Sequence, residues 1–155
     1  MTTPLDPGAT MRTDISLDMT HFAVLVGEWT INGVHRLFPD TDAPGRVTYE
    51  WLEGERFLLG RTRVDHPDIP DSLTVTGPTD DGLGTRYFDS RGVHRLYATD
   101  LQEGVWTMHR AAPGFHQRFR ATFDTAHETI TGSWDLSPDG DRWDHDLALV
   151  YRRVG

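Results

Sequence analysis

From Gly27 to the C-terminal end, apolar and polar residues alternate with a period close to two, and clusters of Gly, Pro or Asp interrupt the alternation. Short alternating segments separated by turn residues are typical of an antiparallel all-β barrel or sandwich. The pattern predicts ten strands, at residues 27–35, 46–53, 56–65, 72–77, 83–89, 93–99, 104–111, 116–124, 128–136 and 142–153.

Four of the interruptions pair a polar residue with glycine, which adopts a positive φ without steric cost and therefore suits tight hairpins. These pairs are Glu53-Gly54, Arg91-Gly92, Glu103-Gly104 and Asp139-Gly140. A chain of consecutive hairpins can close on itself and remove its unpaired sheet edges. We therefore expect a single ten-stranded antiparallel barrel over residues 16–155.

The segment before the strands has a different character. Residues 1–15 contain few apolar residues, so we expect a flexible N-terminal tail. Asp18 or Thr20 can cap a helical turn that contains Phe22 and Leu25 and ends at Gly27. This short apolar turn is predicted to plug one end of the barrel.

Composition restricts the function more than it defines it. The 155 residues contain no cysteine, which excludes thiol nucleophiles, cysteine–zinc sites and disulfide bonds. The net charge of -9 repels phosphate backbones and anionic lipids, so we expect neither nucleic acid nor a membrane as a partner. No signal peptide, metal-ligand spacing or cofactor motif is present, so we expect a cytoplasmic protein without metal or cofactor. A homodimer is left open.

Several runs of residues resemble an uncharacterised bacterial family, a domain of unknown function related to the lipocalin-like, or calycin, barrels. The resemblance covers about Leu17 to Val154 and includes Glu50-Trp51-Leu52-Glu53-Gly54, Tyr87-Phe88-Asp89-Ser90-Arg91-Gly92-Val93, Gln117-Arg118-Phe119, Trp143-Asp144-His145-Asp146-Leu147 and Tyr151-Arg152-Arg153. Gly27-Glu28-Trp29 separately resembles the Gly-x-Trp start of the first strand of calycin barrels. The family resemblance implies the calycin fold and names no substrate. In such barrels an arginine at the end of the last strand often lies against the tryptophan of the first strand, which implies that Arg152 or Arg153 stacks on Trp29.

The chain also resembles the haem-binding nitrobindins, which share the Gly-x-Trp start and carry a histidine near the C-terminus that binds iron. That resemblance implies His145 as an axial haem ligand. Ile31 stands where those proteins have a glycine, and one residue separates His145 from Leu147 where they have His-Leu.

Strand parity indicates which side chains face the interior, because residues two apart share a face. His145 has the parity of Leu147 and Tyr151, Arg110 that of Trp106, and Gln117 that of Phe119. The strand at 93–99 is ambiguous, since Arg95 and Tyr97 compete with Leu96 and Ala98 for the inner face. The other residues predicted to line the cavity are His35, Trp51, Tyr87, Asp89 and Trp134, with Trp29 in the same aromatic wall.

So polar an interior requires partners for its charges, because an unpaired buried charge costs several kcal/mol. One interpretation is internal pairing, with Asp89 bound to Arg95 or Arg91. The other is a ligand site in which Arg110 and Gln117 bind an oxyanion, carboxylate or enolate and His145 titrates near neutral pH.

Three functions follow from this predicted cavity. The first is binding of a small, partly apolar organic molecule. The second is a cofactor-independent cyclase, isomerase or lyase of secondary metabolism, in which His145 moves a proton and Arg110 stabilises negative charge. The third is a nitrobindin-like haem protein.

Overall fold

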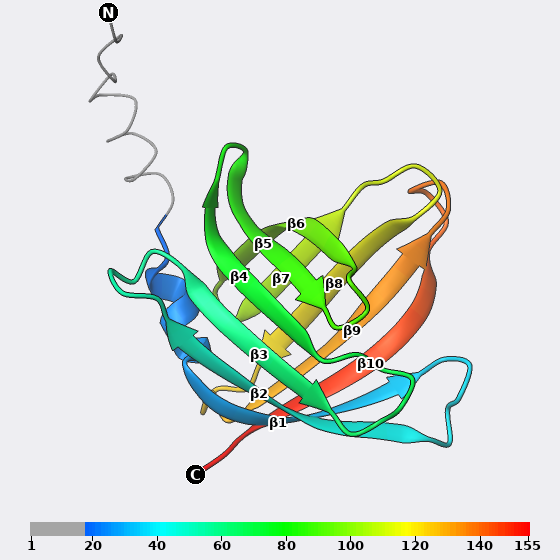
Figure 1. Ribbon diagram of the computed structural model, residues 1–155, viewed down its shortest axis with the longest axis horizontal. Coiled ribbons are helices and arrows are strands. Elements are labelled where there is room, and N and C mark those ends of the chain that lie inside the picture. Colours follow the sequence, from blue (N-terminus) through cyan, green and yellow to red (C-terminus); the bar gives the residue numbers. More distant parts are fainter. Residues whose placement is uncertain (1–17) are drawn as a thin grey trace, which may run out of the picture.

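The computed structural model describes residues 18–155, and the predicted tail at residues 1–15 lies outside them. The chain forms a closed antiparallel barrel of ten strands, in which each strand pairs with its sequence neighbours and β1 pairs with β10 (Figure 1). A short 3-10 helix precedes the barrel. The elements are η1 (Thr20–Leu25), β1 (Gly27–His35), β2 (Asp42–Trp51), β3 (Leu58–Val64), β4 (Ser72–Thr79), β5 (Gly82–Asp89), β6 (His94–Gln102), β7 (Val105–Arg110), β8 (His116–Phe123), β9 (Thr129–Ser137) and β10 (Asp144–Arg153).

The predicted all-β barrel is confirmed, and the boundaries differ most at β2, which begins at Asp42 instead of residue 46. Pro44 and Gly45, which precede the predicted start, lie in the strand and pair with β1. A Cβ atom on Gly45 would lie 2.4 Å from the carbonyl oxygen of Arg63. Glycine therefore permits close approach of β2 and β3, rather than marking a turn.

The hairpin between β6 and β7 has the expected turn chemistry. Gln102 and Val105 are opposite one another, and the two residues between them, Glu103 and Gly104, have φ values of 52° and 75°. Two consecutive positive φ angles define a type I′ turn, whose twist matches that of the two strands.

A β-bulge in β10 changes the face of the side chains that precede it. His145 pairs with Asp135 and Leu147 pairs with Trp134, so Asp146 is an extra residue in the ladder. The prediction that His145 faces the interior is therefore wrong. Its side chain is 51% exposed, and Nδ1 lies 3.8 Å from the Asp135 carboxylate on the outer surface.

One end of the barrel is sealed by η1 and by the first and last strands. Phe22 and Leu25 of the helix are buried in the core, as predicted for a plug. The Trp29 ring is fully buried, and its Nε1 donates a hydrogen bond of 2.8 Å to the carbonyl of Leu25. The Arg153 guanidinium lies 4.1 Å above that ring, which confirms the predicted cation–π contact.

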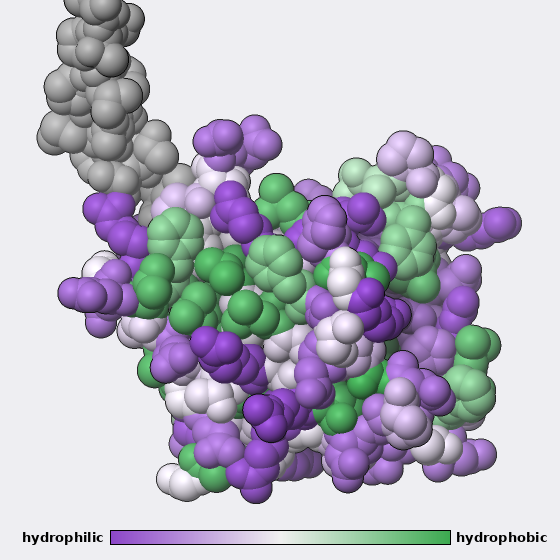
Figure 2. Space-filling view, viewed as in Figure 1, coloured by the Kyte–Doolittle hydropathy of each residue, from purple (hydrophilic) through white to green (hydrophobic). Residues whose placement is uncertain are grey.

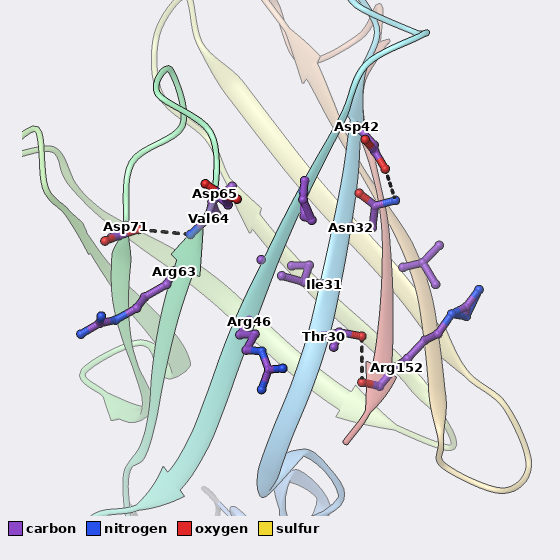
Figure 3. A pocket seen from close by; sticks show the side chains of 13 residues that line it. Thr30, Ile31, Asn32, Asp42, Arg46, Arg63, Val64, Asp65, Asp71 and Arg152 are labelled. Carbon is purple, nitrogen blue, oxygen red and sulfur yellow. Dashed lines mark hydrogen bonds between the residues drawn. The ribbon is translucent and has the colours of Figure 1, made fainter. Parts of the chain in front are cut away.

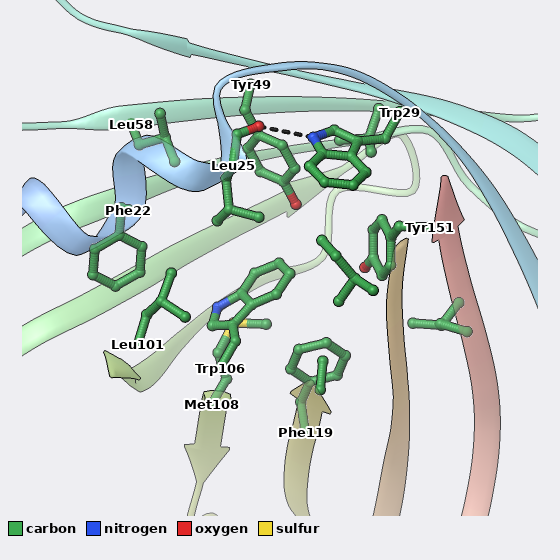
Figure 4. Packing of buried hydrophobic residues seen from close by; sticks show 14 of the residues in the cluster. Phe22, Leu25, Trp29, Tyr49, Leu58, Leu101, Trp106, Met108, Phe119 and Tyr151 are labelled. Carbon is green, nitrogen blue, oxygen red and sulfur yellow. Dashed lines mark hydrogen bonds between the residues drawn. The ribbon is translucent and has the colours of Figure 1, made fainter. Parts of the chain in front are cut away.

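Above this seal, the core is built around Trp106. Its ring meets Phe119 edge-on at 5.0 Å and Tyr49 edge-on at 6.3 Å, and Tyr151 lies 6.1 Å away (Figure 4). Edge-to-face pairs of this kind add stability beyond the burial of their area. These rings fill the part of the barrel interior that lies next to the seal.

The face of the barrel shown in Figure 2 is mainly polar, with apolar side chains gathered over β3 and β4. Phe88 of β5 and Leu96 of β6 are also exposed, at 43% and 48%. No helix among residues 18–155 is long and apolar enough to cross a membrane. The homodimer stays a prediction.

The seal predicts a clear difference between the two C-terminal arginines. Arg153 donates to the carbonyls of Val26 and Val24, at 2.9 and 2.6 Å, as well as stacking on Trp29. Arg153→Met should lower the free energy of unfolding by about 2–4 kcal/mol, since charged hydrogen bonds and a cation–π contact are lost together. Urea denaturation measures this.

Arg152→Met is the matched control, because the Arg152 side chain is exposed and should change stability by less than about 0.5 kcal/mol. Equal effects of the two substitutions would contradict the assignment of the seal to Arg153.

Candidate functional site

The barrel interior contains a cavity of about 290 Å³ that reaches the β3–β4 loop, at the end of the barrel opposite η1. Its walls are largely apolar, and Ile69 and Pro70 of the β3–β4 loop border its mouth. The mouth is formed where β5, β7 and β9 end and where β6, β8 and β10 begin. These strand ends and the β5–β6 turn contribute Tyr87, Arg91, Arg95, Gln117 and Asp146, and Thr62 of β3 and Ser72 of β4 line the same end of the cavity.

Gln117 and Tyr97 form a buried polar pair beside the cavity. The Tyr97 hydroxyl donates a hydrogen bond of 3.1 Å to Oε1 of Gln117. Burial raises the pKa of Tyr97, while the guanidinium groups of Arg95 and Arg110 act in the opposite direction. The amide nitrogen of Gln117 remains available to the cavity.

Arg95 and Arg110 carry the positive charge of the mouth. Arg95 lines the cavity and lies 5.3 Å from the Phe115 ring, while Nη1 of Arg110 makes a long contact of 3.5 Å with the Phe115 carbonyl. Within the described chain, neither guanidinium forms an ion pair with a carboxylate. Two cations without counter-charges next to one cavity favour an anionic ligand.

Asp89, in contrast to these two arginines, is paired within the protein. Its side chain is fully buried and accepts from Nη2 of Arg91 at 2.7 Å, from the Tyr87 hydroxyl at 2.9 Å and from the amide of Val93 at 3.2 Å. The hydrogen bonds from Arg91 hold the pKa of Asp89 well below its usual range. Burial, assisted by this carboxylate, raises the pKa of Tyr87 to about 12. The internal-pairing interpretation is thus confirmed for Asp89, with Arg91 as its partner.

The bulge in β10 brings Asp146 to the cavity in place of His145. Oδ1 of Asp146 lies 3.0 Å from Nε2 of His35. Nδ1 of His35 accepts the Leu37 amide at 3.2 Å, so in the neutral ring the proton resides on Nε2 and points to Asp146. Asp146 is the one acid among the described residues that line the cavity, and it is already engaged by a histidine.

Two further groups lie deeper in the barrel. Tyr49 of β2 and Tyr151 of β10 line the cavity near the seal. Beside them, hydroxyl contacts of 2.9 and 2.8 Å join Thr76 to Thr85 and Thr85 to Thr99.

The residues predicted from strand parity divide into three groups. Tyr87, Arg95, Trp106, Gln117 and Trp134 line the cavity, and β6 resolves in favour of Arg95 and Tyr97 as the inner face. Others lie behind or beside the lining, namely Trp51, Asp89, Tyr97, Phe119, Arg110 and His35, and His145 alone of the predicted residues lies outside the barrel.

Sequence reasoning missed Asp146 and Tyr49, and it placed Tyr151 on the inner face without naming it as a cavity residue. The parity of Tyr49 with Val47, and of Tyr151 with Leu149, was sufficient to place both tyrosines inside. No such signal exists for Asp146, because one bulge reverses its face.

A larger depression, of about 870 Å³, lies on the outer surface of β1, β2, β3 and β10 (Figure 3). Arg46, Arg63 and Arg152 border it together with Asp42 and other acids, and all of these side chains are exposed. Charges that water already solvates offer little selectivity. The interior cavity is therefore the better candidate.

No group of three or more His, Cys, Asp or Glu side chains within residues 18–155 is placed to hold a metal ion.

The chain is a closed ten-stranded antiparallel barrel with a polar-mouthed interior cavity. No protein-family model matches it, and no match is found among curated proteins. Among solved structures it is similar to the crystal structure of Rv2717c from M. tuberculosis, with a TM-score of 0.61 and 12% sequence identity, over 98% of this chain and 100% of that one. At this identity the similarity supports the barrel fold alone, and membership of a calycin family stays a prediction.

The buried Asp89 pair predicts a particular dependence of stability on pH. Because its pKa is lower in the folded protein than in the unfolded chain, the stability it contributes is present above about pH 4 and is lost as the pH falls below that value. Asp89→Asn should therefore be less stable than the parent at pH 7, with the difference shrinking in acid. Urea denaturation between about pH 3 and pH 7 tests this, and parallel profiles for the two proteins would contradict it.

Proposed function

We propose that this barrel binds a small, partly apolar organic anion in its interior cavity. The observation that supports the proposal is the position of Arg95, which lines the cavity without a carboxylate partner among the described residues. Next to it are the amide of Gln117 and the ring of Trp134. A guanidinium and an amide above apolar walls suit a carboxylate attached to a hydrocarbon or aromatic body.

The local charge differs from the net charge of -9. Arg91 neutralises Asp89, and His35 faces Asp146. Three guanidinium groups, those of Arg91, Arg95 and Arg110, thus stand against two carboxylates, those of Asp89 and Asp146, which leaves a small excess of positive charge around the mouth. An acidic protein can thus hold an anion here, because short-range pairing in a partly buried site outweighs distant charges screened by salt.

The cavity volume restricts the size of the ligand. About 290 Å³ lies at the lower end of the usual range for ligand pockets, which is about 300–1,000 Å³. A haem bound through His145 does not fit, because that side chain points away from the cavity toward Asp135. The cyclase, isomerase or lyase hypothesis depended on the same histidine for proton transfer, so binding is the function that we propose.

Removal of the Arg95 charge tests the proposal. With 4-isopropylbenzoate as the probe, Arg95→Gln should raise the Kd about tenfold or more, because a charge-assisted hydrogen bond is lost in a partly buried site. Trp106 and Trp134 line the cavity, so quenching of tryptophan fluorescence reports binding.

Arg86→Gln is the matched control. Arg86 belongs to the adjacent strand β5, faces outward opposite Leu96, and its replacement changes the net charge by the same amount. A parent protein that binds no benzoate, or an equal loss of affinity in both variants, would count against the proposed site.

A second substitution separates the cavity from the outer surface. His145→Ala should leave the Kd for 4-isopropylbenzoate within about twofold of the parent value, since the side chain contacts Asp135 outside the barrel. Isothermal titration calorimetry gives the comparison. A loss as large as that of Arg95→Gln would show that His145 reaches the ligand after all.

A further inference from the structure

The floor of the cavity presents two tyrosine hydroxyl groups that the protein itself does not use. Tyr49 and Tyr151 are 8% and 6% exposed, and both line the cavity. Within residues 18–155, neither hydroxyl has a hydrogen-bond partner, whereas those of Tyr87 and Tyr97 are bound to Asp89 and Gln117. Among the described residues neither oxygen counts as a fully buried polar atom without a partner, so both hydroxyl groups are open to the cavity and free to bind what enters it.

The two hydroxyl groups face the same space. Tyr49 and Tyr151 extend from β2 and β10, the two neighbours of β1, and their oxygen atoms point toward one another across the interior (Figure 4). The rings of Tyr49 and Tyr151 both pack against the Trp106 ring. Its Nε1, which is buried without a partner among the described residues, lies on the side of Leu101 and away from the hydroxyl groups.

The backbone keeps the Tyr49 ring in this position. A Cβ atom on Gly60 would lie 2.6 Å from Cε1 of Tyr49 and 2.5 Å from the Thr74 hydroxyl. Glycine at this point of β3 therefore leaves the room that the ring occupies. The hydroxyl direction follows from strand packing and not from a hydrogen bond within the protein.

Both tyrosines act as donors. Burial raises the pKa of Tyr49 and of Tyr151 well above the usual value, and the neighbouring Tyr151 raises that of Tyr49 further. Each hydroxyl therefore keeps its proton at neutral pH and can donate one hydrogen bond. A carbonyl oxygen has two lone pairs and can accept both.

We propose that the floor is a second polar subsite, in which Tyr49 and Tyr151 donate together to one uncharged carbonyl oxygen of the ligand. This inference rests on the proposed function, and it narrows the ligand to an organic acid with a carbonyl group at the end remote from its carboxylate. The carboxylate lies at Arg95 and Gln117, and the apolar middle contacts Met108 and Leu149. The charged lining residues, Arg91, Arg95 and Asp146, all belong to the mouth, so the floor favours a neutral acceptor.

A pair of probes with the same shape tests the subsite. 4-Acetylbenzoate carries a carbonyl oxygen where 4-isopropylbenzoate carries a methyl group. The parent protein should bind the acetyl probe about five- to tenfold more tightly, because the hydroxyl groups find an acceptor in one complex and not in the other. The double variant Tyr49→Phe/Tyr151→Phe should bind both probes with similar affinity, and calorimetry measures each Kd.

Tyr87→Phe is the control for loss of a tyrosine hydroxyl from the same cavity. That hydroxyl already donates to Asp89, so its removal should leave the ratio of the two affinities unchanged, whatever happens to their absolute values. Ligand-free Tyr49→Phe/Tyr151→Phe should melt no lower than the parent, since no protein hydrogen bond is removed.

The outcomes separate this inference from the proposed function. If both probes bind with equal affinity and Arg95→Gln weakens both, the anion site stands and the carbonyl subsite is refuted. A preference for the acetyl probe that survives in the double variant also refutes the subsite. If neither probe binds, the proposed function and this inference fail together, and a clear fall in melting temperature in the double variant would show that the protein itself uses the hydroxyl groups.

Discussion

Arg153 seals one end of the barrel that the pairing of β1 with β10 closes, and the cavity depends on that seal. Its guanidinium covers the Trp29 ring and donates to carbonyl groups of the segment that leads from η1 into β1. It also donates to the carbonyl of His127 in the β8–β9 turn. One side chain of the last strand thus ties together the helix, the first strand and a distant hairpin, so that only the opposite end of the barrel remains open. The rings around Trp106 fill the space next to this seal and leave the volume above it for a ligand.

Some charged side chains at the mouth are paired within the protein, and Arg95 is left to bind a ligand. Asp89 has as many hydrogen bonds as a buried carboxylate can use, and they hold the β5–β6 turn in place through Arg91 and Val93. Asp146 is similarly restrained by His35. Arg95 has no such counter-charge within the described residues, although it is covered enough to lose part of its hydration. A cation in that state is stabilised by an anion that enters from solvent, which is why the arrangement supports binding more than it supports packing.

Periodicity predicted this fold well, because an alternation of two residues per repeat is a direct consequence of strand geometry. All ten strands, the plug and the cavity positions of Gln117 and Trp106 could be anticipated in this way, whereas the tryptophan–arginine seal was implied by the resemblance to calycin barrels and the inner face of the strand that contains Arg95 was left ambiguous. The outward position of His145 could not be anticipated, since a bulge adds one residue to β10 and reverses the face of the residues before it. The pairing of Asp89 with Arg91 instead of Arg95 was equally beyond the pattern, because it depends on how the turn at Gly92 directs the Arg91 side chain back toward the strand.

The hydrogen bonds that join the hydroxyl groups of Thr76, Thr85 and Thr99 all run in one direction. Thr99 donates its only hydroxyl proton to the carbonyl of Tyr97, so its oxygen can only accept from Thr85. Thr85 must in turn accept from Thr76, whose proton is then committed as well. Thr76 therefore presents to the cavity an oxygen with lone pairs and no proton to offer. The backbone carbonyl of Tyr97 in β6 in this way determines that the Thr76 hydroxyl, two strands away in β4, accepts a hydrogen bond from the cavity. The deep wall of the cavity therefore accepts hydrogen bonds at Thr76, whereas the tyrosine hydroxyl groups of the floor donate them.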